Sequence, residues 1–287
     1  MNSKDNKENK EDTFTIPNII AIKSIIKARL NKKLAVNLRL EINILLKIKH
    51  QHIVQLYGIE KTINLLMEYC EYGDLSLFMK KNFSKKENNP LIGPWKGFNE
   101  YIVLEFLFQL ASALEYMNEK SVVHRDLKPQ NILLTIDPNR RLHPIPKPLF
   151  SNPTSYCLVF LPFLKLADFG FARSLAKENL ASTLCGSPLY MAPEILEGKT
   201  YSANVDLWSL GTILYELVMS RTPYNATNHV DLLNKIKSSS GVYFPGEKIK
   251  SNGKDDSNAF CSPLKELIKG LLKQKSKERI SFQDFFD

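Results

Sequence analysis

The spacing of hydrophobic residues changes near residue 70 and divides the chain into two parts. Residues 17–25 and two short apolar runs, HIVQLYGI and INLLMEYC, have the composition of β-strands, and the two runs are spaced like a hairpin. Apolar residues recur at near-helical spacing between the first strand and this hairpin, at Leu30, Leu34, Leu38, Ile42, Leu45 and Leu46. They predict an amphipathic helix over residues 31–48. The first part is therefore expected to be small and rich in strands.

Long apolar segments of helical character dominate the second part. NEYIVLEFLFQLASALEYMNEK (residues 99–120) and VDLWSLGTILYELVMS (residues 205–220) are so apolar that both helices should be buried. The run YGDLSLFMKK begins another helix, with Asp74 as its N-cap. Residues 83–98 contain Asn, Lys, Pro and Gly, residues 135–155 contain five prolines, and both segments are predicted to be loop insertions.

Length and composition suit a two-part, α+β protein. The 287 residues are 44% hydrophobic, enough for a sizeable core, and a cleft near Glu68–Gly73, where the parts join, is the expected ligand site. Four widely spaced cysteines without a C-x-x-C pair argue against a zinc site or a disulfide framework. The polar start MNSKDNKENKED is unlike a signal peptide, and no apolar run is long enough to span a bilayer. We therefore expect a soluble intracellular protein with a disordered segment at residues 1–16.

The net charge of +9 is concentrated at the N-terminal end, because residues 1–50 contain 11 Lys or Arg and 5 Asp or Glu. One interpretation is a solvated helix face. Another is a basic face for acidic partners, a phosphorylated segment or lipid headgroups, and the last predicts peripheral, salt-sensitive membrane association. Nucleic acid is not expected as a partner, since no recognised binding motif accompanies the charge.

Three motifs occur in a fixed order along the second part. VVHRDLKPQNILL covers residues 122–134, LKLADFGFAR contains Asp168, and MAPE ends at Glu194. Together they resemble the eukaryotic protein kinases, and the resemblance extends from about residue 19 to residue 287. It implies a bilobal kinase fold, with a small strand-rich N-lobe at residues 17–70 and a larger helical C-lobe at residues 71–287.

The residue types in these motifs suit phosphoryl transfer from ATP to a protein hydroxyl. Asp126 can accept the proton of the substrate hydroxyl, and Lys128 can hold the γ-phosphate as a point charge. Asn131 and Asp168 offer oxygen ligands for Mg²⁺, a hard cation. A lysine at position 128 is typical of serine/threonine kinases rather than tyrosine kinases.

The N-lobe supplies the expected phosphate-binding lysine. Lys23 lies in the run AIK, which resembles the family's V-A-I-K motif, and Glu41 is the acidic residue of the predicted helix 31–48. The resemblance implies that Glu41 holds Lys23 on the α- and β-phosphates. Without the later motifs, Lys23 would be interpreted as a surface lysine and Glu41 as a solvated helix residue.

The adenine site follows from the same resemblance. Met67 would be the gatekeeper, and residues 68–70 would form the hinge, with the Glu68 carbonyl and the Cys70 amide paired to the adenine edge. Ala21 and Leu133 would enclose the ring. Taken alone, Met67 and Leu133 are better explained by core packing.

A glycine-rich phosphate loop is expected before Lys23, yet the first glycine is Gly58. The family's first two strands are missing with it. Losing two charge-assisted bonds of about 1.5 kcal/mol each would weaken ATP binding by about 100-fold. A truncated chain, a weakened enzyme and a non-catalytic scaffold are competing explanations, and the presence of the catalytic set favours the first.

The segment from Asp168 to Glu194 resembles a kinase activation segment. The resemblance implies that Arg125 clamps a phosphate on it, with Thr183 as the first candidate phosphosite and Ser182 as the second. Ser187 would contact Asp126 and Lys128 and help to recognise the substrate hydroxyl.

Other residues have implied structural roles. Glu194 and Arg279 would form a buried ion pair, and Asp206 would hold the catalytic-loop backbone. A stacked apolar column would link the lobes through Leu45, Leu56, His124 and Phe169.

A narrower resemblance is carried by TLCGSPLYMAPEIL, ADFGFAR, EYCEYGDL and LASALEYM. These runs are similar to the autophagy-initiating, ULK-type serine/threonine kinases, and the insertions resemble fungal members. The resemblance implies a cytoplasmic kinase recruited to the preautophagosomal structure by scaffold proteins. The chain ends at Asp287, so the partner-binding C-terminal domain of that family is not expected in it. The alternative function is a kinase-like scaffold that binds partners without turnover.

Overall fold

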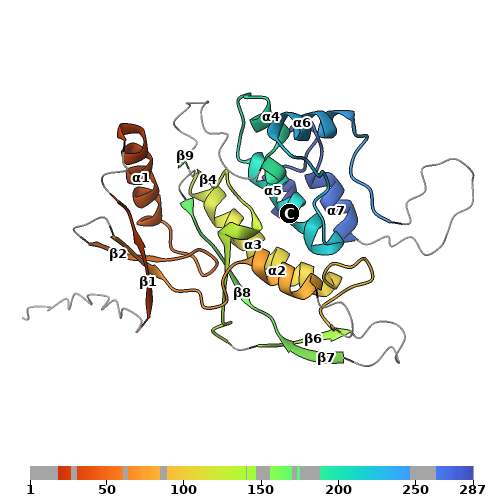
Figure 1. Ribbon diagram of the computed structural model, residues 1–287, viewed down its shortest axis with the longest axis horizontal. Helices are drawn as coiled ribbons and strands as arrows, with labels where there is room; N and C mark the ends of the chain where they lie inside the picture. Colours follow the sequence, from red (N-terminus) through yellow and green to blue (C-terminus); the bar gives the residue numbers. More distant parts are fainter. Residues whose placement is uncertain are drawn as a thin grey trace, which may run out of the picture.

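The computed structural model places a small strand-rich lobe beside a larger helical lobe (Figure 1). It describes residues 19–26, 31–60, 64–84, 89–139, 141–146, 156–169, 173–174, 188–245 and 263–286. The expected α+β, bilobal kinase fold is confirmed. Residues 1–16, predicted to be disordered, lie outside the described residues.

The N-lobe is an antiparallel sheet with one helix, α1 (Lys32–Leu45), beside it. Its strands, in spatial order, are β1 (Ile20–Ser24), β3 (Asn64–Glu68) and β2 (Leu56–Glu60). The predicted hairpin is therefore confirmed as β2–β3. Helix α1 is shorter than predicted, because the backbone N–H groups of Lys47 and Ile48 both donate to the carbonyl of Ile44 and close the helix in a turn.

The helices of the C-lobe pack around α5, which is almost wholly buried, and α3, which is buried on one face. In chain order they are α2 (Leu75–Ser84), α3 (Glu100–Glu119), α4 (Pro193–Leu196), α5 (Asn204–Met219), α6 (His229–Ser238), α7 (Pro263–Leu271) and α8 (Phe282–Phe286). The N-cap prediction for α2 is confirmed, since Asp74 Oδ1 accepts the Leu77 N–H at 2.9 Å. Helix α2 extends to Ser84, so the predicted loop at residues 83–98 begins inside it.

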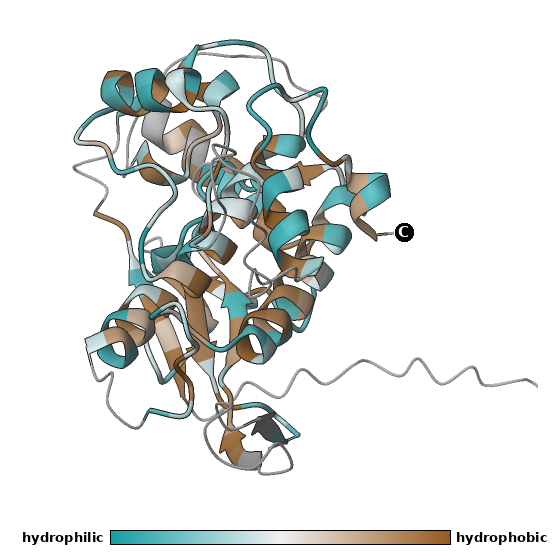
Figure 2. Ribbon diagram, turned by 90° about the vertical axis from the view of Figure 1, so that its right-hand side faces the viewer, coloured by the Kyte–Doolittle hydropathy of each residue, from teal (hydrophilic) through white to brown (hydrophobic). Residues whose placement is uncertain are grey.

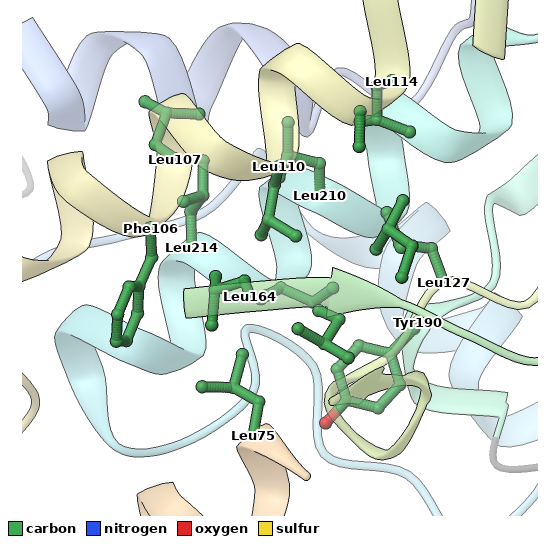
Figure 3. Close-up of a cluster of buried hydrophobic side chains, with 14 of the residues drawn as sticks. Leu75, Phe106, Leu107, Leu110, Leu114, Leu127, Leu164, Tyr190, Leu210 and Leu214 are labelled. Atoms are coloured by element: carbon green, nitrogen blue, oxygen red, sulfur yellow. The ribbon is translucent and has the colours of Figure 1, made fainter. Parts of the chain in front are cut away.

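Close packing of α5 explains why a glycine lies inside a helix. A Cβ atom at Gly211 would lie 2.8 Å from Leu271 Cβ, so only glycine lets α7 approach this closely. In Figure 3, leucines of α3 and α5 meet in one cluster together with Leu164 and Leu75. The outer helices carry hydrophilic and hydrophobic residues around each turn, as amphipathic surface helices do (Figure 2).

The C-lobe also contains short antiparallel ribbons. They pair β4 (Val122–Val123) with β9 (Arg173–Ser174), β5 (Ile132–Thr135) with β8 (Phe163–Leu166), and β6 (Leu142–Pro146) with β7 (Tyr156–Phe160). Among the described residues, no helix has the length and apolarity needed to cross a membrane.

The prediction of a loop over residues 135–155 was wrong, because β6 lies within that range. Prolines disfavour central strands, and this segment has five. Pro144 and Pro146 are tolerated because β6 belongs to a two-stranded ribbon, where each strand has an edge that needs no ladder bonds.

Candidate active site

Lys23 joins the sheet, α1 and the start of the activation segment. Its Nζ lies 2.8 Å from Glu41 Oε1 and 3.3 Å from Asp168 Oδ1. Burial lowers the pKa of Lys23, but the carboxylates of Glu41 and Asp168 outweigh it and the pKa is raised. Asp168 has a φ of 61°, a strained backbone for a non-glycine residue and one that is common at functional sites.

The predicted catalytic residues also come together. Lys128 Nζ lies 2.7 Å from Asp126 Oδ2, and Asn131 Nδ2 donates to the Asp126 backbone oxygen at 2.7 Å and to Oδ2 at 2.9 Å. A short 3₁₀ turn over Pro129–Asn131 brings Asn131 back to Asp126. Both side-chain contacts use Oδ2, and among the described hydrogen bonds Asp126 Oδ1 accepts none. That oxygen is therefore suited to accept a proton.

Backbone bonds hold this loop beside Asp168. The Ala167 N–H donates to the Asn131 carbonyl at 2.8 Å, and His124 Nε2 donates to the Ala167 carbonyl at 3.0 Å. Asp206 accepts the backbone N–H groups of His124 and Arg125 at 2.7 and 2.9 Å. Burial raises the pKa of Asp206, although these bonds favour its ionised form.

The four residues predicted to form an apolar column are all buried, namely Leu45, Leu56, His124 and Phe169. The three apolar members belong to one hydrophobic core. The rings of His124 and Phe169 lie 4.9 Å apart. Phe169 is thus packed inside the protein while the neighbouring Asp168 reaches Lys23.

On the predicted adenine side, strand register places Ala21 directly opposite Met67. Cys70 and Leu133 are half-buried against the core. Burial, and then the nearby Glu68 carboxylate, raise the pKa of the Cys70 thiol to about 12, so this cysteine stays protonated and unreactive at neutral pH.

Sequence reasoning missed a charge contact behind the hinge. Lys165 Nζ on β8 lies 2.5 Å from Glu68 Oε1, and Glu68 Oε2 accepts the Gln55 N–H at 3.1 Å. The pair joins the two lobes. The sequence signal was a lone lysine in the apolar run FLKL, which does not reveal its partner.

The residues present fit a magnesium ion. Asn131 donates its amide hydrogens to Asp126, which leaves the amide oxygen for another partner, and the Asp168 side chain is half exposed. Within the described ranges, no three His, Cys, Asp or Glu residues are grouped as a metal centre. The Asn131 amide oxygen and the Asp168 carboxylate are the donors expected when phosphate oxygens complete the coordination of Mg²⁺.

The remaining predicted residues lie in the C-lobe and in the activation segment. The Arg125 guanidinium lies over the Tyr201 ring at 5.0 Å, a contact that the sequence analysis did not predict. Arg279 donates to both carboxylate oxygens of Glu194, at 2.7 and 3.0 Å, inside the C-lobe. The candidate phosphosites Thr183 and Ser182 and the substrate-contacting Ser187 lie outside the described residues.

Comparison with known proteins defines the class. The family profile described as "Protein kinase domain" matches residues 13–287. The chain therefore belongs to the protein kinase family.

Within the protein kinase family, the chain is similar to serine/threonine kinases of three fungi. The chain is 47% identical over 286 residues to "Serine/threonine-protein kinase ATG1" of Pyricularia oryzae, which covers 93% of this chain and 28% of that protein. It is 47% identical to "Serine/threonine-protein kinase apg-1" of Neurospora crassa, and the match covers 94% of this chain and 29% of that protein. It is 46% identical to "Serine/threonine-protein kinase atg1" of Penicillium rubens, and the match covers 93% of this chain and 29% of that protein. The predicted resemblance to ULK-type kinases is confirmed, and the chain spans less than a third of these relatives' length.

Proposed function

We propose that the chain is a serine/threonine protein kinase that uses ATP and Mg²⁺. The observation that carries this proposal is the contact of Lys23 with both Glu41 and Asp168, beside a catalytic loop in which Asn131 holds Asp126. Five side chains from distant segments thus surround one site. Such an arrangement supplies the positioning and charge neutralisation that phosphoryl transfer requires.

Each residue takes the role that the kinase resemblance implies, and the contacts of Lys23, Asp126 and Asn131 support it. Lys23, fixed by Glu41, would hold the α- and β-phosphates, and the Glu68 carbonyl and Cys70 amide would hold adenine between Ala21 and Leu133. Asn131 and Asp168 would hold magnesium, which when bound would neutralise phosphate charge. Asp126 Oδ1 would accept the proton of the substrate hydroxyl while Lys128 stabilises the transferred group.

The names of the relatives support a place for this kinase in the initiation of autophagy. On this proposal it is cytoplasmic, acts on serine and threonine residues of protein substrates, and assembles with scaffold proteins at the preautophagosomal structure as a peripheral membrane protein. Activation would follow phosphorylation of Thr183, with Arg125 as the phosphate clamp and Ser187 at the substrate hydroxyl.

Transfer of radiolabel from γ-labelled ATP to a serine/threonine substrate protein tests the proposed activity. The wild-type chain should label the substrate on serine or threonine, and Asp126→Ala should not. Equal labelling by both proteins would assign the activity to another site or to a contaminant.

A thermal-shift titration separates this proposal from the scaffold alternative. A ligand that binds only the folded state raises its melting temperature, so millimolar MgATP should stabilise the wild-type chain and stabilise Lys23→Met less. Absence of any stabilisation would favour a kinase-like scaffold.

A further inference from the structure

We propose that an apolar groove behind the hinge docks an acidic linear peptide of a partner protein through the peptide's apolar side chains. The groove has a volume of about 520 Å³ and lies between α2, the end of β5 and the end of β7. Its lining includes Leu77 and Phe78 of α2, Thr135 at the end of β5, Ile136 after it, and Phe160 of β7. This volume is within the range of about 300–1,000 Å³ found for ligand pockets.

Large apolar side chains are exposed in and beside the groove. Four of the lining residues are among the exposed large hydrophobic residues of the described chain, and two neighbours on the β6–β7 ribbon extend the patch: Tyr72, Leu77, Ile136, Phe160, Leu142 and Leu158. Leu142 pairs directly with Phe160, and Leu158 lies two residues before it, so all three share one face of the ribbon. Contiguous exposed patches of this kind mark interaction sites more often than isolated residues do.

The walls of the groove are held in place by hydrogen bonds. Thr135 Oγ1 donates to Glu71 Oε2 at 2.7 Å, and the Ile136 N–H donates to Glu71 Oε1 at 3.3 Å. The Tyr72 N–H donates to the Leu134 carbonyl at 3.0 Å. These bonds fix the segment after the hinge to the end of β5, so a partner would meet a preformed surface.

The charges at the rim favour an acidic partner. Lys80 and Lys81 on α2 are exposed, Lys81 lines the groove, and neither forms an ion pair with another described residue. The acidic groups nearby are already engaged. Asp137 is buried and accepts from Arg141 Nε at 3.0 Å, and the Glu71 carboxylate is held by β5. The charge of Arg141 is balanced by Asp137, so Lys80 and Lys81 supply the positive charge of the rim.

The groove is separate from the candidate active site. Its lining contains none of the residues assigned to ATP, magnesium or the substrate hydroxyl. Binding can therefore be measured without turnover, in the presence or absence of the proposed kinase activity. Failure of this proposal and failure of the proposed function would be distinguishable.

A phage-displayed library of random 12-residue peptides is first selected on the immobilised chain. The affinity of a labelled synthetic copy of the most enriched peptide is then measured by fluorescence anisotropy. The variants are Phe160→Ser and the double variant Lys80→Glu/Lys81→Glu. Phe108→Ser is the matched control, because Phe108 is 68% exposed and Phe160 is 67% exposed, yet Phe108 does not line the groove. Thermal melts establish that each variant is folded.

We expect enriched peptides with at least two large apolar residues and flanking Asp or Glu. Phe160→Ser should weaken binding by about tenfold or more, because the peptide loses a large apolar side chain that it would cover, whereas Phe108→Ser should not. The charge-reversal variant should bind more weakly and with less dependence on salt. No enrichment, or equal binding to wild type and folded Phe160→Ser, would overturn the proposal. Concentration-dependent dimerisation abolished by Phe160→Ser would replace the peptide with a second copy of the chain and would also overturn it.

Discussion

The Nζ atom of Lys23 lies 2.8 Å from Glu41 Oε1, although the two residues are 18 positions apart in the sequence. This contact fixes α1 against the edge strand of the N-lobe sheet. The same amine reaches Asp168 at 3.3 Å, in a segment 145 residues further on. One side chain thus connects the sheet, α1 and the start of the activation segment, and several predicted effects of substitution follow from it.

Replacing Glu41 with glutamine should lower kcat/KM for ATP by about 10- to 100-fold, because Lys23 loses its buried anionic partner and its position on the phosphates. Steady-state kinetics with varied ATP would measure this. Glu115→Gln is the control, since Glu115 is an exposed glutamate on α3. A change smaller than twofold in Glu41→Gln would remove Glu41 from the proposed site.

The buried Glu194–Arg279 pair should be important for stability. The Arg279 side chain is fully buried, and Arg279→Ala would leave the Glu194 carboxylate without its bidentate partner. We expect a loss of about 3–5 kcal/mol in the free energy of unfolding, measured by denaturant titration. Arg279→Lys should destabilise less, because it keeps the charge but not the paired geometry. If Arg279→Ala unfolds at the wild-type midpoint, the pair does not anchor the C-lobe.

The Glu68–Lys165 contact should couple the hinge to β8. Each side chain is largely shielded from solvent. Lys165→Met therefore leaves the Glu68 carboxylate without its cationic partner, and Glu68→Gln leaves the Lys165 ammonium group without its anionic partner. A double-mutant cycle should therefore give an interaction free energy of about 1 kcal/mol or more. Additive effects in the double variant would show that the two side chains act independently.

His52 should make the protein less stable in mild acid. Burial is the main cause that lowers its pKa from 6.5 to about 4, while Nδ1 donates to the Leu164 carbonyl. Because the unfolded chain binds a proton near pH 6.5 and the folded chain does so only near pH 4, stability should fall as pH decreases through this window. The total loss should be on the order of 3 kcal/mol. Denaturant titrations from pH 7.5 to 4 should show a smaller loss in His52→Gln, and equal losses would contradict the assignment.

Most of the fold and the central residues of the site could be predicted from sequence because they depend on local patterns. Apolar spacing located α1, α3 and α5, and the motifs around Asp126 and Asp168 have fixed offsets. The ion pair of Lys23 with Glu41 was accessible because the kinase resemblance implies such a pair and the predicted helix contains one acidic residue.

The unpredicted features depend on contacts between distant segments. The β6–β7 ribbon was missed because its prolines argue against a strand unless the strand is known to have an edge. The partners of Lys165 and Arg125, namely Glu68 and Tyr201, are set by tertiary packing and have no local signature.

The most direct test of the central claim is a single-turnover measurement of phosphoryl transfer from ATP to a serine peptide, combined with the MgATP dissociation constant. For Asp126→Asn, we predict unchanged MgATP affinity and a transfer rate at least about 100-fold below wild type, the size of a general-base contribution. Asp231→Asn, which replaces a half-exposed residue in the first turn of α6, should transfer at the wild-type rate. Equal transfer rates for wild type and Asp126→Asn would contradict the account.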